Sequence, residues 1–189
     1  MKIEYHIKNM VCDRCIKVVR NELIDEGVEV EEVELGRLLI NSRNPVTDQK
    51  LLIDVLNNNG FELINSQDQI LVETIKLELI RLLKNLPVKK QGTLSKILAD
   101  VTRTDYSKLS KLFSVTEKVT IEKYFIKLKI EKVKELIQNR ELNFTEISQL
   151  LDYSNVNYLS RQFKSETGMS LTQYKNLDKN FRNSLDQIV

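Results

Sequence analysis

The sequence predicts two domains of different class, an α+β domain followed by an all-helical domain. Three observations lead to this prediction. Residues 1–66 alternate between short strand patterns and helix patterns. Residues from 67 onward show only helical patterns, and one of these repeats fifty residues further on. The chain has 189 residues, of which 41% are hydrophobic, so each part holds enough apolar side chains for its own core.

The first element is a strand over residues 2–8. Ile3, Tyr5 and Ile7 alternate with charged or polar residues, as in a strand with one buried face. His6, the only histidine, falls on the polar side and is interpreted as a surface residue. The patterns then predict a helix from Ile16 that ends before Gly27, strands over 28–35 and 38–40, a helix starting at Thr47-Asp48 and ending at 57–60, and a strand over 61–64. This order, βαββαβ, is that of the ferredoxin-like fold.

The helical part begins with a strong apolar stripe from Gln69 to Leu86, which Pro87 and Gly92 end. A short helix capped by Thr93, a turn over 103–105, a helix over 106–113 and a long helix over 121–139 follow.

Residues 145–164 predict two helices separated by a tight break. The first runs from about Thr145 to Leu151, and the break ends at Ser154, which we expect to cap the second helix. That second helix directs Leu159 and Phe163 toward a core and leaves a polar face. This is the layout of a helix-turn-helix, whose second helix lies in the major groove of DNA.

The same spacing occurs in Leu109–Phe113 and in Leu159–Phe163, which indicates a duplicated helix-turn-helix. The helix over 121–139 joins the two copies. About eighteen residues at 1.5 Å each span roughly 27 Å, which helps to place two recognition helices near the ~34 Å groove repeat.

The C-terminal part resembles the AraC/XylS family of transcription regulators. The matching residues are Ile147-Ser148, Tyr153-Ser154, Tyr158 to Lys164, Gly168 and Tyr174. Asp152 and Lys118 stand where the family has glycine, and Leu171 where it often has proline. The resemblance implies a DNA-binding domain over 67–178, followed by a tail over 179–189. It also implies double-stranded DNA as partner, RNA polymerase as a further candidate partner, and a monomer or homodimer.

The resemblance also implies which side chains face the DNA. Arginine pairs with guanine, asparagine with adenine and serine with either, whereas lysine suits phosphates. The expected base-facing residues are Ser107, Ser110, Lys111, Asn157, Tyr158 and Arg161, and the expected phosphate contacts are Lys108, Lys164 and Lys175.

Residues 1–66 resemble the heavy-metal-associated domain of copper chaperones and metal-transporting ATPases. The match is carried by Met10, Cys12 and Cys15 in a loop before a helix, and by Gly60-Phe61 near the end. It implies Cys12 and Cys15 as ligands of a soft metal ion, with Cu(I) favoured over zinc, which needs further ligands.

Two other interpretations of the cysteine pair are a redox dithiol and packed cysteines without function. In a further interpretation, the whole domain serves only for interaction. A helix N-terminus is expected to lower the pKa of Cys15. Met10 is expected to be a buried anchor of the loop.

The charge distribution and the absence of catalytic motifs limit the classes of function that this chain can have. Residues 1–66 hold 8 Lys/Arg and 12 Asp/Glu, whereas the remainder holds 21 and 15, which suits a polyanionic partner for the second part. No catalytic constellation is visible, so we expect no enzyme. The absence of a signal region or apolar span predicts a cytoplasmic protein without membrane contact. Two competing functions are a metal carrier whose helical part docks a protein and a thiol oxidoreductase.

Overall fold

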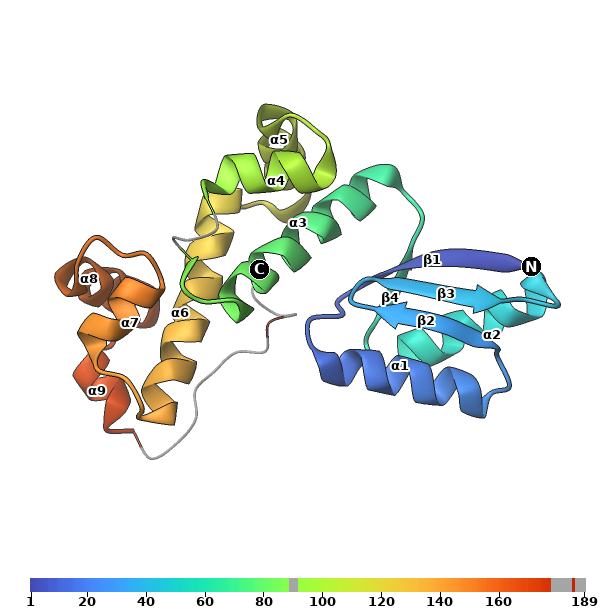
Figure 1. The fold of residues 1–189 in the computed structure, drawn as a ribbon, viewed down its shortest axis with the longest axis horizontal. Coiled ribbons are helices and arrows are strands. Elements are labelled where there is room, and N and C mark those ends of the chain that lie inside the picture. Colours follow the sequence, from blue (N-terminus) through green and yellow to red (C-terminus); the bar gives the residue numbers. More distant parts are fainter. Residues whose placement is uncertain (89–91, 178–184, 186–189) are drawn as a thin grey trace. The chain divides into compact units, whose positions relative to one another are not determined.

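The computed structural model describes residues 1–88, 92–177 and 185, and the chain forms two compact units, Met1–Leu77 and Glu78–Val189 (Figure 1). The division falls inside helix α3 (Gln67–Lys84), so this helix contributes to both units. The sequence-based boundary at 66/67 coincides with the start of the same helix. Within the described residues, no helix is long and apolar enough to cross a membrane.

Unit 1 is a four-stranded antiparallel sheet with two helices. Along the chain the elements are β1 (Lys2–Lys8), α1 (Asp13–Asp25), β2 (Val30–Glu34), β3 (Arg37–Asn41), α2 (Pro45–Asn58) and β4 (Glu62–Ile64). The strand order is β2-β3-β1-β4, so β1 lies between β3 and β4. This element order is the βαββαβ order that the sequence predicts.

The core of unit 1 lies between the sheet and the two helices, which Figure 1 shows on the same side of the sheet. Tyr5 and Ile7 of β1 are buried in it, as the alternating pattern predicts. Val19 of α1 and Leu52 of α2 are fully buried in the same cluster. Met10 is also fully buried and so is an anchor of its loop, as predicted.

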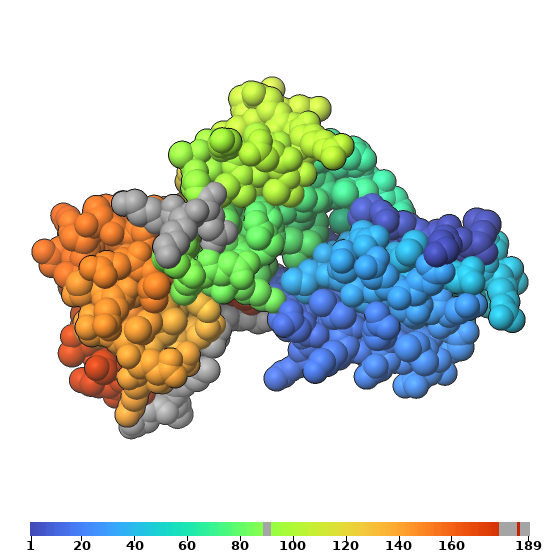
Figure 2. Space-filling view, in the orientation of Figure 1, coloured from blue at the N-terminus to red at the C-terminus, as the bar shows by residue number. Residues whose placement is uncertain are grey.

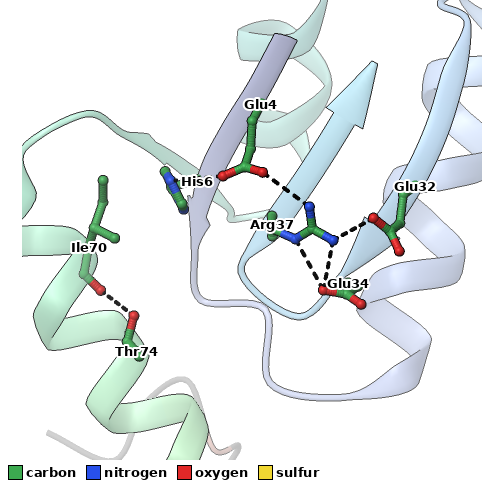
Figure 3. A network of polar contacts seen from close by, with 7 residues as sticks. All are labelled: Glu4, His6, Glu32, Glu34, Arg37, Ile70 and Thr74. Carbon is green, nitrogen blue, oxygen red and sulfur yellow. Dashed lines mark hydrogen bonds and ion pairs between the residues drawn. The ribbon is translucent and has the colours of Figure 1, made fainter. Parts of the chain in front are cut away.

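The opposite face of the sheet carries a charged network around Arg37 (Figure 3). The Arg37 guanidinium donates to Glu4 at 3.1 Å, to Glu34 at 3.1 Å, and to Glu32. These carboxylates raise the pKa of Arg37 above its usual value. His6 lies at the edge of this network, with Nε2 3.5 Å from a Glu4 oxygen, in agreement with its predicted place on the polar face. Because these pairs are partly exposed, each contributes at most about 1 kcal/mol.

The first half of α3 packs against two loops of unit 1. The backbone N–H of Asn9, which has a positive φ of 73°, donates to the Glu73 carboxylate at 3.0 Å. Gly36, in the β2–β3 turn, has φ of 77°, and a Cβ on it would lie 2.5 Å from the Leu77 side chain. The positive φ favours glycine at position 36, and a Cβ there would also have to displace the end of the flexible Leu77 side chain.

Unit 2 is built from helices. After the second half of α3 come α4 (Leu94–Thr102), α5 (Tyr106–Glu117), α6 (Ile121–Asn139), α7 (Phe144–Leu150), α8 (Val156–Thr167) and α9 (Leu171–Lys175). The long helix α6 has the bounds that the apolar stripe predicts, and it contacts α5, α7, α8 and α9. In Figure 2 the first helix pair, in yellow-green, and the second pair, in orange, form separate lobes of this unit.

Some predicted boundaries are wrong by one or more residues. Helix α2 begins at Pro45 instead of Thr47-Asp48, because Asn44 caps it by accepting from the Thr47 N–H at 3.4 Å. Helix α3 runs two residues earlier than predicted at both ends. Apart from Leu185, the predicted tail over 179–189 lies outside the described residues.

Candidate nucleic-acid interface

The first helix-turn-helix consists of α4 and α5, which contact each other. Arg103, with φ of 51°, ends α4, and Asp105 caps α5 by accepting from the Ser107 N–H at 2.8 Å. Leu109 and Phe113 of α5 are fully buried, as predicted. The spacing of these two residues turns the opposite face of α5 outward.

The predicted DNA-facing residues of α5 lie on that outward face. Ser107, Lys108 and Lys111 are exposed, and Ser110 is half-buried. The Ser107 hydroxyl donates to the Asp105 carboxylate at 2.5 Å, so its proton is engaged in the cap and its lone pairs remain available as acceptors. These hydrogen bonds lower the pKa of Asp105.

The second helix-turn-helix consists of α7 and α8. Helix α7 begins with a capping box, in which the Asn143 side chain accepts from the Glu146 N–H and the Glu146 side chain accepts from the Asn143 N–H. Asp152 adopts φ of 56° in the turn, a conformation that aspartate tolerates better than most residues. The predicted cap at Ser154 is wrong, because Asn155 caps α8 by accepting from the Tyr158 N–H at 2.9 Å.

The predicted DNA-facing residues of α8 are all exposed, namely Asn157, Tyr158, Arg161 and Lys164. They lie opposite Leu159 and Phe163, which are fully buried. Lys175, a predicted phosphate contact on α9, is exposed, and its Nζ lies 5.8 Å from the centre of the Phe144 ring.

The duplication extends beyond the helix pairs. Phe113 makes an edge-on contact with Tyr124 of α6 at 5.4 Å between ring centres, and Phe163 makes the same contact with Tyr174 of α9 at 5.5 Å. The helix after each pair is capped in the same way, by Thr120 and by Ser170. The two copies are therefore related through their cores and through the helix that follows each recognition helix.

Sequence reasoning placed Tyr153 in the second turn but missed its environment. The ring of Tyr153 is buried, and its hydroxyl has no hydrogen-bond partner in the part of the chain that the structure describes. Burial raises the pKa of Tyr153, and the nearby Tyr158 and Glu166 act in the same direction. The ring centres of Tyr153 and Tyr158 are 6.0 Å apart with the rings tilted by 47°, and Lys129 Nζ lies 4.8 Å from the centre of the Tyr153 ring.

Lys129 was not among the predicted functional residues. It lies on α6, and its ammonium is 5.2 Å from the ring centre of Phe125 and 4.8 Å from that of Tyr153. Burial lowers the pKa of Lys129, while the charge of Asp152 acts in the opposite direction. The amphipathic pattern of α6 could not reveal this contact, because Tyr153 belongs to a distant turn.

In unit 1, Cys12 and Cys15 lie together at the start of α1. Their Sγ atoms are 3.4 Å apart, and both side chains are partly exposed. The predicted lowering of the Cys15 pKa is wrong in sign, because burial raises it more than the backbone hydrogen bonds at the helix start lower it. Among the described residues, no group of three or more His, Cys, Asp or Glu side chains is placed to hold a metal ion.

Comparison with known families identifies the class of this interface. Residues 98–177 match the model of a helix-turn-helix domain family. The helix-turn-helix domain that the sequence predicts is thereby confirmed for these residues, and its assignment to the AraC/XylS family stays a prediction. No match was found among curated proteins. The resemblance of residues 1–66 to a heavy-metal-associated domain stays a prediction.

Solved structures of similar fold include the two described next. One is the C-terminal domain of AraT, a response regulator from Geobacillus stearothermophilus, with a TM-score of 0.50 and 20% identity, covering 62% of this chain and 95% of that one. The other is the C-terminal domain of the two-component response regulator yesN from Fusobacterium nucleatum subsp. nucleatum, with a TM-score of 0.45 and 25% identity, covering 53% and 97%. At 20% identity, the first likeness concerns the fold alone.

Proposed function

We propose that this chain is a sequence-specific DNA-binding transcription regulator of the AraC/XylS type. One observation carries the proposal. The chain has two helix-turn-helix units. In the second helix of each, a leucine and a phenylalanine on the inner face are buried, and hydrogen-bonding side chains on the outer face are exposed. The family match over 98–177 supports the same function.

Within this function we assign different roles to the two recognition helices. Helix α8 offers Asn157 and Arg161, which can each make paired hydrogen bonds to adenine and guanine respectively. The exposed face of α5 offers Lys108 and Lys111, which suit phosphates or single base acceptors. We therefore expect α8 to read sequence more strongly than α5.

The test is the selection of duplexes from a random pool by the full chain, followed by affinity measurement at about 150 mM salt. Specific binders typically prefer their site by a factor of about 10³–10⁷ over random duplex. Arg43→Ala in unit 1 is the control, because the Arg43 side chain is 92% exposed and lies outside the helical unit. A pool without enrichment, and equal affinity for every duplex, would exclude the proposed function.

We further propose that Cys12 and Cys15 bind a soft metal ion such as Cu(I). Their Sγ separation of 3.4 Å supports this, because two thiol groups that already face each other can meet one ion. The strand order β2-β3-β1-β4 supports a ferredoxin-like fold for the unit that holds them. Zinc is disfavoured because it usually takes four ligands.

A Cu(I) titration under reducing conditions, against a competing chelator, tests this metal site. The full chain should bind one equivalent, and Cys12→Ser/Cys15→Ser should bind none. If DNA and metal are coupled, each should change the affinity of the other by the same factor, about 5- to 150-fold. Unchanged copper binding by the double variant would exclude the site. No copper binding, together with formation of a Cys12–Cys15 disulfide in a separate titration with oxidised glutathione, which is reduced in the exchange, would favour the redox function instead.

A further inference from the structure

A chain of three contacts connects the linking helix to the recognition surface. Lys129 of α6 lies with its ammonium near the rings of Phe125 and Tyr153. The Tyr153 ring in turn meets the ring of Tyr158, which is 47% exposed and lies in the first turn of α8. The contacts thus run from α6, through the turn of the second helix-turn-helix, to a residue that faces outward.

We propose that Lys129 is a positioning residue for recognition helix α8, acting through Tyr153 on Tyr158. The proposal rests on the proposed function, since it assumes that α8 meets DNA. A cation held against aromatic faces in a partly desolvated place contributes more than one in water. Lys129 therefore fixes the orientation of the Tyr153 ring relative to α6.

The local hydrogen bonds make Tyr153 suited to transmit this position. Its backbone N–H donates to the Ser148 carbonyl at 2.9 Å, which fixes the main chain at the end of α7. Its hydroxyl makes no hydrogen bond in the described part of the chain, so packing contacts alone hold this buried side chain. When the contact with Lys129 is lost, the ring is less constrained, and Tyr158 loses part of the support against which its ring lies.

Lys129 has no carboxylate within ion-pair distance among the described residues that could replace the rings. Asp152 influences it electrostatically without a close contact. Lys129 and Asp152 also line a cavity of about 580 Å³, so one side of Lys129 meets open space. The first helix-turn-helix has Thr104 and Arg103 in its turn and hence no aromatic ring to hold in this manner.

The first experiment compares specific and random duplex binding by four variants of the full chain. Lys129→Met should weaken binding to the selected duplex about tenfold, because it keeps the stem and removes the cation. Lys129→Arg should retain affinity within about twofold, because guanidinium also binds to aromatic faces. Lys132→Met is the matched control, since Lys132 lies on the same helix and pairs with Glu135 at 2.5 Å. It should have little effect.

The fourth variant, Tyr158→Ala, and in addition the double variant Lys129→Met/Tyr158→Ala test the route. If Lys129 acts through Tyr158, the double variant should bind less than about twofold more weakly than Tyr158→Ala alone. Full additivity would overturn the proposal. Lys129→Met could also lose the same affinity for the selected and the random duplex, with a salt slope reduced by the equivalent of about one phosphate contact. That result would show that Lys129 contacts DNA directly, and it would also overturn the proposal.

A second measurement does not depend on DNA. Amide hydrogen exchange of Tyr153 and Tyr158 should become faster by about tenfold in Lys129→Met and stay unchanged in Lys132→Met. Unchanged exchange in Lys129→Met would exclude the positioning role even if the chain binds DNA. Faster exchange in a chain that selects no duplex would instead retain the positioning role and exclude the proposed function.

Discussion

The two helix-turn-helix units have the same buried residues but different turns and helix ends. Leu109 and Phe113 in the first correspond to Leu159 and Phe163 in the second, and all four are fully buried. Each phenylalanine meets a tyrosine of the following helix in the same edge-on geometry. The interior of the unit is therefore what the duplication preserves.

The differences lie in the caps. Helix α5 of the first helix-turn-helix ends at Lys118, which has φ of 60°. The equivalent position at the end of α8, in the second helix-turn-helix, is Gly168. Helix α7 starts with a full capping box at Asn143, whereas Thr93 makes no side-chain cap bond to α4. The first helix-turn-helix instead has a hydrogen bond from the Tyr106 hydroxyl to Glu122 of α6 at 2.5 Å. The residue equivalent to Tyr106 in α8 is a valine, which cannot make this bond. Each unit thus reaches a similar core by different local means.

The largest expected effect comes from removing the shared core residue. Phe163→Ala and Phe113→Ala should each lower the free energy of unfolding by about 3–5 kcal/mol, because both truncate a buried aromatic side chain. Chemical denaturation measures the free energy of unfolding. Hydrogen exchange should show the loss of protection mainly in the helix-turn-helix that carries the substitution. An unchanged unfolding midpoint for either variant would mean that the assigned helix faces are wrong.

Arg161 of α8 and Lys108 of α5 should lose different kinds of DNA binding when they are replaced. Arg161→Ala should weaken specific binding by about 1–3 kcal/mol and relax the preference at one base pair. Lys108→Ala, at a predicted phosphate contact, should weaken binding to all duplexes alike and reduce the salt slope by about one. Affinity measured over a salt series on selected and random duplex separates the two patterns. If Arg161→Ala lost the same on both duplexes, Arg161 would be a phosphate contact.

The caps should give a smaller difference. Asn143→Ala removes a side chain that accepts from two N–H groups, at 2.9 and 3.0 Å, and should destabilise by about 1 kcal/mol. Thr93→Ala should stay within about 0.5 kcal/mol, since the Thr93 hydroxyl makes no cap bond. Thermal unfolding of the two variants under identical conditions makes the comparison. Equal losses would contradict the asymmetry.

The smallest effect is expected where the two units exchange a lysine for a glycine. Lys118→Gly should stabilise by about 0.5–1 kcal/mol, because glycine adopts positive φ without steric penalty. Gly168→Lys should destabilise by a similar amount through the backbone alone, since a Cβ there would meet nothing within 4 Å. Denaturant titrations of both variants measure the pair. A destabilised Lys118→Gly would mean that the bond from Lys118 Nζ to the Val115 carbonyl at 2.8 Å outweighs the strain.

Periodicity was sufficient to predict the helices and their inward faces. The bounds of α6 follow from its apolar stripe, and the buried leucine and phenylalanine of each unit follow from their spacing. The outward faces then place the predicted DNA-facing residues at the surface. These features depend on short-range geometry, which the sequence contains directly.

Features that depend on long-range packing could not be predicted. Ser154 and Asn155 are both good capping residues, and only the path of the turn after Asp152 selects Asn155. The direction of the Cys15 pKa depends on how deeply α1 is buried, which no local pattern gives. The contact of Lys129 with Tyr153 joins two elements far apart in sequence.

The repeated aromatic pairs also have a consequence for the speed of folding. Phe113 with Tyr124, and Phe163 with Tyr174, join residues close in sequence, so closing these contacts needs only short loops. In unit 1, strand β1 pairs with β3 and with β4, which both come much later in the sequence. The pairing with β4 brings His6 next to Ile64, so it closes a long loop. Chains with local contacts fold faster than those with distant ones. Unit 1, which precedes unit 2 along the chain, therefore has a first strand that pairs later than the local contacts of unit 2 form.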